Sequence, residues 1–201
     1  MKEFPILFST PMVQAILEGR KTQTRRIIKP QPNSHDDDNF PWLIEEGCVF
    51  IPIKCPYGHP GDLLWVKETF ALSSTRWRYK ADGDWTFEEK EMGEDAKWKS
   101  SRFMPKAAAR ILLQVEEIRV QRLIDITEED AIAEGIEPVI LHEIKSWKRY
   151  DGYEIVTSDP VVSFWSLWAS INGEESWHSN PWLWVIAFKV ISTTGKPNLE
   201  S

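Results

Sequence analysis

A lysine and a threonine stand three residues apart in a short basic segment near the start of the chain. This segment, Gly19 to Arg26, holds four cationic side chains and two hydroxyls within eight residues. A tight turn there would bring the amine of Lys21 within reach of the hydroxyl of Thr24. A lysine whose pKa is lowered by burial and by neighbouring cations is partly neutral and can take the proton of a hydroxyl nucleophile. The segment therefore indicates either a catalytic or anion-binding site or a solvated basic loop.

The charge balance sets this basic segment apart from the rest of the protein. The first thirty residues hold six Lys or Arg side chains against two Glu, whereas the whole 201-residue chain has a net charge of −7. A cationic island in an acidic protein favours one focused anionic or polar ligand over a broad surface that follows a nucleic-acid backbone.

The elements that must position these side chains follow from local sequence signals. Apolar side chains repeat at helical spacing within residues 10–18, and Gly19 is placed to end that helix. Cations are favoured near a helix C-terminus. This preference accounts for the basic residues under the alternative that the segment is a solvated loop. Strands are predicted at residues 5–8, 49–53, 63–70 and 181–190, and residues 110–123 predict either two strands or one long bent strand.

Two further helices are predicted in the second half of the chain. Residues 127–135 begin with Thr127 as N-cap, continue with acidic residues in the first turn and end at a glycine. Residues 160–170 place apolar side chains on one helical face. Residues 30–41 predict a mobile acidic loop, and residues 77–79 and 85–87 a hairpin. Three short helices among more numerous strands indicate an α+β fold with a mixed or antiparallel sheet.

Several common classes of site are disfavoured by the sequence. Cys48, Cys55 and His59 lie within twelve residues but lack a paired CxxC pattern, so we expect no metal site. We also expect no cofactor, because no GxGxxG, P-loop or GxSxG sequence occurs. No apolar run reaches the roughly 20 residues that cross a bilayer. Two cysteines and no secretory segment predict a cytoplasmic protein without a membrane partner.

Aromatic residues are numerous and dispersed. The eleven tryptophans are too many for one binding cage, so most of them are predicted to lie in the core. Trp65 is a candidate for stacking on a ligand, although a position in the core is more frequent for any single tryptophan. Glu68 is a secondary candidate for a polar contact with a ligand. The alternative is an exposed position on a sheet without such a role.

The basic segment and three later stretches together resemble the ASCH domain family. Members carry a Gly-x-Lys-x-x-(Glu or Thr)-x-Arg pattern after the first helix, which matches this chain at Gly19, Lys21, Thr24 and Arg26. Later stretches resemble, in the family's order, its Gly-Asp turn and strand, its short acidic helix and its final strand: residues 60–66, 126–135 and 184–188. These ordered matches favour a functional site over a solvated loop.

The resemblance implies a fold similar to the PUA RNA-binding barrel. We expect a PUA-like mixed β-barrel or sheet with three short helices, formed by a single domain over residues 1–191. The chain is longer than a minimal ASCH domain, like the longer phage and prophage members. The extra length is expected as insertions near residues 30–50, 72–100 and 138–160, and residues 192–201 as a flexible tail.

The resemblance also implies a function linked to RNA or modified nucleosides. One ASCH branch is an amidohydrolase that deacetylates N4-acetylcytidine with a Lys, a Thr three residues later and a Glu in the acidic helix. Lys21, Thr24 and Glu134 are the corresponding residues, and Thr24 stands where much of the family has Glu, which points to this branch. The alternatives are a non-catalytic RNA- or nucleotide-binding module and a ribonuclease. Expected ligand-binding residues are Arg20, Arg25, Arg26, Trp65 and Glu68.

Overall fold

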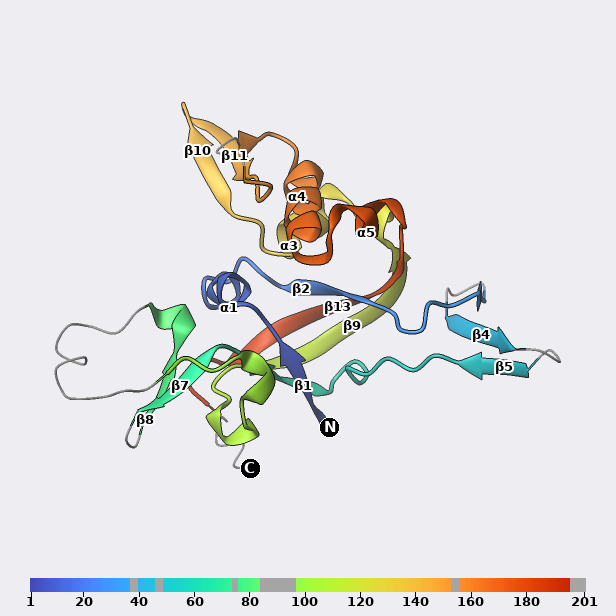
Figure 1. Ribbon diagram of the computed structural model, residues 1–201, viewed down its shortest axis with the longest axis horizontal. Coiled ribbons are helices and arrows are strands. Elements are labelled where there is room, and N and C mark those ends of the chain that lie inside the picture. Colours follow the sequence, from blue (N-terminus) through green and yellow to red (C-terminus); the bar gives the residue numbers. More distant parts are fainter. Residues whose placement is uncertain (37–39, 46–48, 74–75, 84–96, 153–155, 196–201) are drawn as a thin grey trace.

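A mixed five-stranded sheet runs through the centre of the molecule (Figure 1). The computed structural model describes residues 1–36, 40–45, 49–73, 76–83, 97–152 and 156–195. β1 and β6 are parallel, and the other neighbouring strands are antiparallel. In sheet order the strands are β1 (Glu3–Leu7), β6 (Leu63–Lys67), β9 (Leu112–Arg122), β13 (Trp182–Ser192) and β2 (Gln23–Ile27). The predicted α+β class is confirmed, and in the described part of the chain the sheet is open, not a closed barrel.

Two long strands, β9 and β13, form the middle of this sheet. Residues 112–122 make one continuous strand, so the single-strand alternative is the one observed. The register between β9 and β13 shifts next to Ala187 and again next to Val190. Such irregularities bend a strand and increase its twist. The main core packs α1 (Thr10–Leu17) against the sheet, with buried side chains that include Ile6, Val13, Ile16, Leu64, Leu113 and Ile186.

The three predicted helices are present, and the described residues contain one more. Thr127 caps α3 (Glu128–Ala133) by accepting a hydrogen bond from the backbone N–H of Asp130. Asp159 caps α4 (Pro160–Asn172) in the same way. A short helix that the sequence reading missed, α5 (Glu174–His178), follows α4 directly. None of the described helices is long and apolar enough to span a lipid bilayer.

A second, smaller core joins α3 and α4 to the ends of the long strands. Its buried residues are Leu123, Ile126, Ala131, Ile136, Phe164, Trp168 and Leu183. This cluster holds the two helices beside β2, where Figure 1 shows them. Most of the described tryptophans lie in a core cluster or pack against one, as predicted, although few of them are fully buried. Trp168 and Trp184 are buried, whereas the other tryptophans of the described residues are half-buried.

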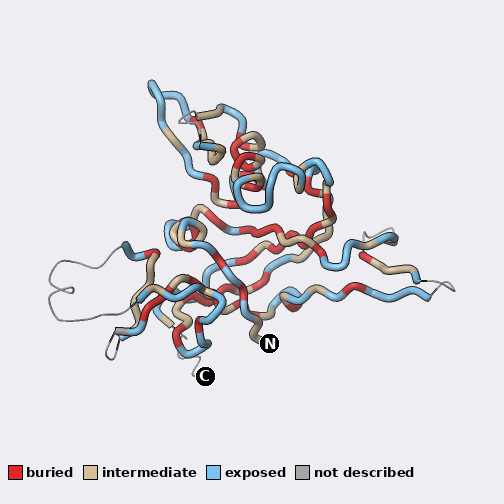
Figure 2. The backbone as a smooth tube through the Cα atoms, in the orientation of Figure 1, coloured by how far each residue is buried: buried red, intermediate tan, exposed pale blue. Residues whose placement is uncertain are grey.

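Three small sheets extend from the central one, with many exposed residues along them (Figure 2). Residues 30–41, expected to form a loop, contribute strands to the first small sheet. The predicted strand 63–70 breaks at residues 68–69, and residues 70–73 pair with residues 76–79. Residues 85–87, the predicted partner of residues 77–79 in a hairpin, lie outside the described residues. The sheets are β3 (Ser34–His35), β4 (Pro41–Glu45) and β5 (Val49–Pro52); β7 (Phe70–Ser73) and β8 (Arg76–Tyr79); and β10 (Pro138–Leu141), β11 (Ile144–Lys148) and β12 (Val156–Thr157).

Candidate functional site

The end of α1, the start of β2 and the end of α3 meet around Lys21. The backbone N–H of Lys21 donates to Ala15 at the end of α1, and Lys21 forms an isolated bridge with Glu134. The Lys21 ammonium donates to the backbone oxygen of Glu134 at 2.8 Å and to its carboxylate Oε2 at 2.9 Å. Lys21 is 1% exposed and Glu134 6%. The structure therefore brings together, in a buried ion pair, two residues that are 113 positions apart in the sequence.

Arg25 holds the other side of the Glu134 carboxylate. Its Nη1 lies 3.2 Å from Glu134 Oε1, and its Nη2 lies 2.7 Å from Asp130 Oδ2. Asp130 also accepts from Arg119 at 2.6 Å. Glu134 and Asp130 are four residues apart, so both carboxylates lie on one face of the α3 turn. The buried carboxylate of Glu134 is thus shared by two cations.

Burial controls the charge of Lys21. Loss of solvation lowers the pKa of Lys21 below its ordinary value of 10.5, although the carboxylate of Glu134 opposes this shift. The nearby guanidinium groups of Arg26 and Arg25 lower the pKa further. A buried ammonium flanked by two permanent cations loses its proton more readily than an exposed lysine does.

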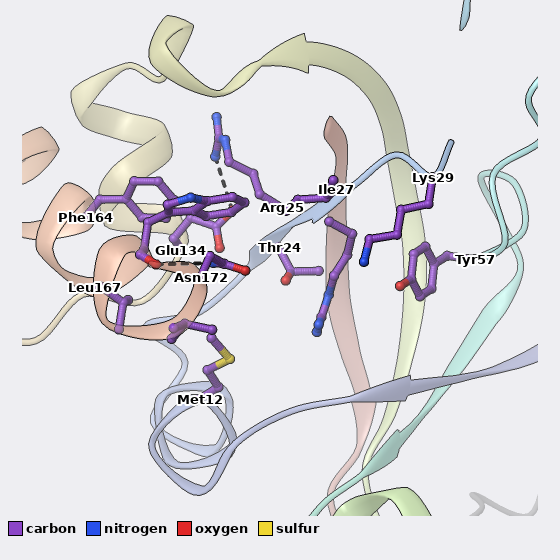
Figure 3. A pocket seen from close by; sticks show the side chains of 13 residues that line it. Met12, Thr24, Arg25, Ile27, Lys29, Tyr57, Glu134, Phe164, Leu167 and Asn172 are labelled. Atoms are coloured by element: carbon purple, nitrogen blue, oxygen red, sulfur yellow. Dashed lines mark hydrogen bonds and ion pairs between the residues drawn. The ribbon is translucent and has the colours of Figure 1, made fainter. Parts of the chain in front are cut away.

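A pocket of about 380 Å³ opens between β2, α1 and α4 (Figure 3). Thr24, Arg25, Arg26 and Glu134 line its polar wall, and the aromatic and aliphatic side chains of α4 line the other wall. Thr24 is 2% exposed, and its hydroxyl makes no hydrogen bond to any described residue. The Thr24 oxygen is therefore available to a ligand in this pocket.

Arg26 lines the same pocket and packs on an aromatic ring. Its Nη2 donates to the backbone oxygen of Leu7 at 2.6 Å, and its guanidinium carbon lies 5.1 Å from the centroid of Phe8. The Lys21 ammonium lies 5.7 Å from the same ring. Lys21 itself does not line the pocket and lies behind the wall that Glu134 forms. Thr24, Arg25, Arg26 and Glu134 are thus the sequence-predicted residues in contact with the pocket.

Three predicted ligand-binding residues lie elsewhere. Arg20 pairs with Glu18 at 2.6 Å and lines a separate cavity of about 350 Å³ that shares Glu134 with the pocket. Trp65 on β6 lies beneath the Lys67 ammonium. Glu68, predicted to bind a ligand with an exposed position on a sheet as the alternative, is buried, and both its oxygens accept from Arg110, at 2.9 and 3.0 Å. Neither Trp65 nor Glu68 lines the pocket.

Several residues of the site were not predicted from the sequence. Asp130 could have been found, because its i to i+4 spacing from Glu134 places both carboxylates on one helical face. The apolar side chains of α4 carried the 3.6-residue pattern of a core helix, which does not distinguish a core from a pocket wall. Tyr57 and Lys29 also line the pocket and gave no signal.

A larger cleft of about 870 Å³ lies between the β3–β5 sheet and β9. Its lining includes Phe40, Trp42 and Trp184 but not Lys21, Arg25 or Glu134. Arg119 and Gln121, which bond to Asp130 and Arg25, also line this cleft. The smaller pocket is the better candidate, because chemistry needs convergent polar groups with shifted pKa values more than it needs volume.

The cysteine and histidine residues do not form a metal site in the described part of the chain. No group of three or more His, Cys, Asp or Glu side chains there is arranged to hold a metal ion. Cys48 lies outside the described residues. Burial raises the pKa of Cys55 to about 11, so at neutral pH this thiol is protonated.

No family model, curated protein or solved structure matches this chain.

A glycine makes the close approach of α3 to Lys21 possible. Gly135 has φ +85°, and a Cβ atom there would lie 2.7 Å from Lys21 Cβ and 3.2 Å from Lys21 Cα. Gly19 has a similar φ of +73° with open space around it. We expect Gly19→Ala to cost about 1–2 kcal/mol of unfolding free energy from backbone strain alone. Gly135→Ala should cost about 1–3 kcal/mol more, because it also overpacks the site.

Urea denaturation of the two glycine variants measures this difference. Equal losses of unfolding free energy would show that α3 can move away from Lys21 without penalty.

Proposed function

We propose that this protein is an ASCH-type, PUA-like amidohydrolase that removes the acyl group from an N4-acylated cytidine-type nucleoside. One observation carries the proposal: Glu134 of the buried Lys21–Glu134 pair lines the same pocket as Thr24, whose hydroxyl makes no hydrogen bond to a described residue. A base with a lowered pKa, a hydroxyl nucleophile and a carboxylate are the parts that acyl transfer needs.

The reaction begins when neutral Lys21 accepts the proton of the Thr24 hydroxyl as the Thr24 oxygen adds to the amide carbonyl carbon. The Lys21 proton passes along the existing hydrogen bond to the Glu134 carboxylate. Glu134 then protonates N4 as the C–N bond breaks, which releases the unacylated cytosine base. Glu134 deprotonates a water molecule, whose oxygen adds to the carbonyl carbon of the Thr24 ester. The proton returns from Glu134 through Lys21 to the Thr24 oxygen as the ester C–O bond breaks, which frees the carboxylic acid and restores the Thr24 hydroxyl. Lys21 and Glu134 thus move one proton between nucleophile and leaving group.

The oxyanion formed on the carbonyl oxygen needs a hydrogen-bond donor. Arg26 lines the pocket, and β2 is an edge strand, so it also presents backbone N–H groups that β13 does not use. One good donor stabilises such an oxyanion by about 3–4 kcal/mol. The side chains of Phe164 and Leu167 on α4 form an apolar wall opposite these donors, which suits a nucleobase.

Deacylation of N4-acetylcytidine tests this proposal. Purified protein is incubated with N4-acetylcytidine, and the formation of cytidine and acetate is followed. We expect turnover that is lost in Lys21→Ala and retained in Lys189→Ala, because Lys189 is an exposed lysine on β13 outside the pocket. Absence of turnover with acylated cytidines, together with salt-sensitive RNA binding that Lys21→Ala abolishes, would contradict the enzyme proposal.

The pH profile of turnover should report the state of Lys21. Protonated Lys21 cannot act as the base, so kcat/KM should rise with pH and level off above the pKa of Lys21. Because burial lowers that pKa, the plateau should begin below the 10.5 of an ordinary lysine. Lys21→Arg should show no such rise, since a guanidinium stays protonated throughout. A rate that does not change from neutral to alkaline pH would exclude Lys21 as the base.

A second candidate function is a non-catalytic reader of a nucleotide or RNA. The observation that favours it is the engagement of the Lys21 ammonium by two oxygens of Glu134, behind the pocket wall. In this case Lys21 stabilises the wall, and Arg26 contacts a phosphate. Salt-dependent binding without turnover distinguishes this candidate from the enzyme.

A further inference from the structure

The end of the pocket opposite Glu134 carries groups that the proposed deacylation does not use. Figure 3 draws Lys29 and Tyr57 at this end, away from Phe164 and Glu134, with Thr24 between the two groups in this view. Lys29 follows β2 directly, and Tyr57 precedes the turn that leads into β6. Both side chains come from segments fixed to the central sheet.

The two cations at this end, the half-buried Arg26 and the exposed Lys29, lack the anionic partners that Arg25 and Arg110 have. Arg25 is paired with Glu134 and Asp130, and Arg110 with Glu68 and Asp82. In the described part of the chain, Arg26 and Lys29 form no ion pair.

One atom of Arg26 is also left without a partner. The Nε atom of Arg26 is buried and makes no hydrogen bond. An unpaired buried donor costs about 1–3 kcal/mol, more for a charged group, and a bound acceptor removes that cost. The two cations and the Tyr57 hydroxyl, which makes no hydrogen bond to a described residue, therefore suit an anion with several oxygens.

We propose that this end of the pocket binds the phosphate of the substrate, so that the preferred substrate is a nucleoside monophosphate and not the free nucleoside. Arg26 and Lys29 supply the positive charge, and Tyr57 donates a further hydrogen bond. The oxyanion of the reaction is then left to a backbone N–H of β2. The preference for a nucleoside monophosphate as substrate rests on the proposed deacylation. Phosphate binding at this end of the pocket rests only on Arg26, Lys29 and Tyr57.

The charge distribution favours a mononucleotide over a long strand. The unpaired cations at the pocket are few, and the chain as a whole carries −7. A strand that extends beyond the pocket would meet an acidic protein, whereas one phosphate meets only the local cations. The pocket of about 380 Å³ also lies within the range of sites for small ligands.

Calorimetric binding of cytidine and cytidine 5′-monophosphate tests the subsite without any chemistry. We expect the monophosphate to bind wild-type protein about tenfold or more tightly than cytidine, because charge-assisted hydrogen bonds are added. Lys29→Gln should reduce this ratio severalfold, and Lys189→Gln, which removes an exposed lysine of the same sheet, should leave it unchanged. Equal affinities for the two ligands, or an unchanged ratio in Lys29→Gln, would overturn the subsite.

Turnover then separates the subsite from the reaction. N4-acetylcytidine, its 5′-monophosphate and a short oligonucleotide that contains it are compared by kcat/KM, and the monophosphate is expected to be the best of the three. Tighter binding of the monophosphate without deacylation of any substrate supports the subsite and contradicts the proposed reaction. Deacylation with no preference for phosphate supports the reaction and contradicts the subsite. A preference for the oligonucleotide overturns the assignment to a mononucleotide.

Discussion

Glu134→Gln should lower the free energy of unfolding by about 3–5 kcal/mol, the cost of breaking a buried ion pair. The Glu134 carboxylate accepts from Lys21 at 2.9 Å and from Arg25 at 3.2 Å, and all three side chains are buried. An amide keeps the shape but not the charge, so the Lys21 ammonium remains buried without its anion. Arg25 retains Asp130 as a partner, which is why the loss is not larger.

Chemical denaturation at neutral pH measures this loss, with Glu137→Gln as the matched control. Glu137 pairs with Lys148 at 3.0 Å, but both side chains are about half exposed, so its replacement should cost no more than about 1 kcal/mol. Adding Lys21→Met to Glu134→Gln should recover part of the stability, because the unpaired cation is then absent. A Glu134→Gln protein as stable as the Glu137→Gln control would show that Lys21 is already neutral in the folded protein.

The elements around the site were predictable where the signal was local. The cap at Thr127, the acidic first turn and the closing Gly135 all act within one helix, and α3 begins and ends as they indicate. The same holds for the repeat that forms α1. The partnership of Lys21 with Glu134 is not local, and only the resemblance to ASCH proteins suggested it before the structure placed the two in contact.

The roles within the basic segment depended on a strand that the sequence did not reveal. Residues 19–26 were expected as a turn after a helix, yet β2 begins at Gln23. Once a strand is present, side chains alternate between its two faces. Arg25 therefore turns to the carboxylates of α3, whereas Arg26 packs on Phe8. A loop interpretation had no reason to separate the two arginines.

The positions of Trp65 and Glu68 show a second limit of sequence reasoning. A carboxylate in an apolar stretch can be exposed on a sheet or buried against a cation, and the choice depends on what the fold brings to it. For Glu68 that partner is Arg110, 42 residues away. Nothing within the segment 63–70 encodes this contact.

Thr24→Val should reduce deacylation of N4-acetylcytidine by at least about 10³-fold, the scale of loss when a nucleophile is removed. Valine keeps the shape of threonine, and the Thr24 hydroxyl makes no hydrogen bond to a described residue, so stability should change by less than about 1 kcal/mol. Thr24→Ser, which retains a hydroxyl, should keep measurable turnover. Steady-state rates and denaturation midpoints of both variants give the two readouts.

Thr22→Val is the matched control, since Thr22 is exposed two residues earlier in the same segment. Its turnover should equal that of the wild type, because its side chain does not reach the pocket. If Thr24→Val retained turnover while Lys21→Ala lost it, the attacking oxygen would have to come from water that Lys21 activates directly. If both variants retained turnover, the chemistry would lie outside the pocket, and the buried pair would be left with a structural role in holding α3 against β2.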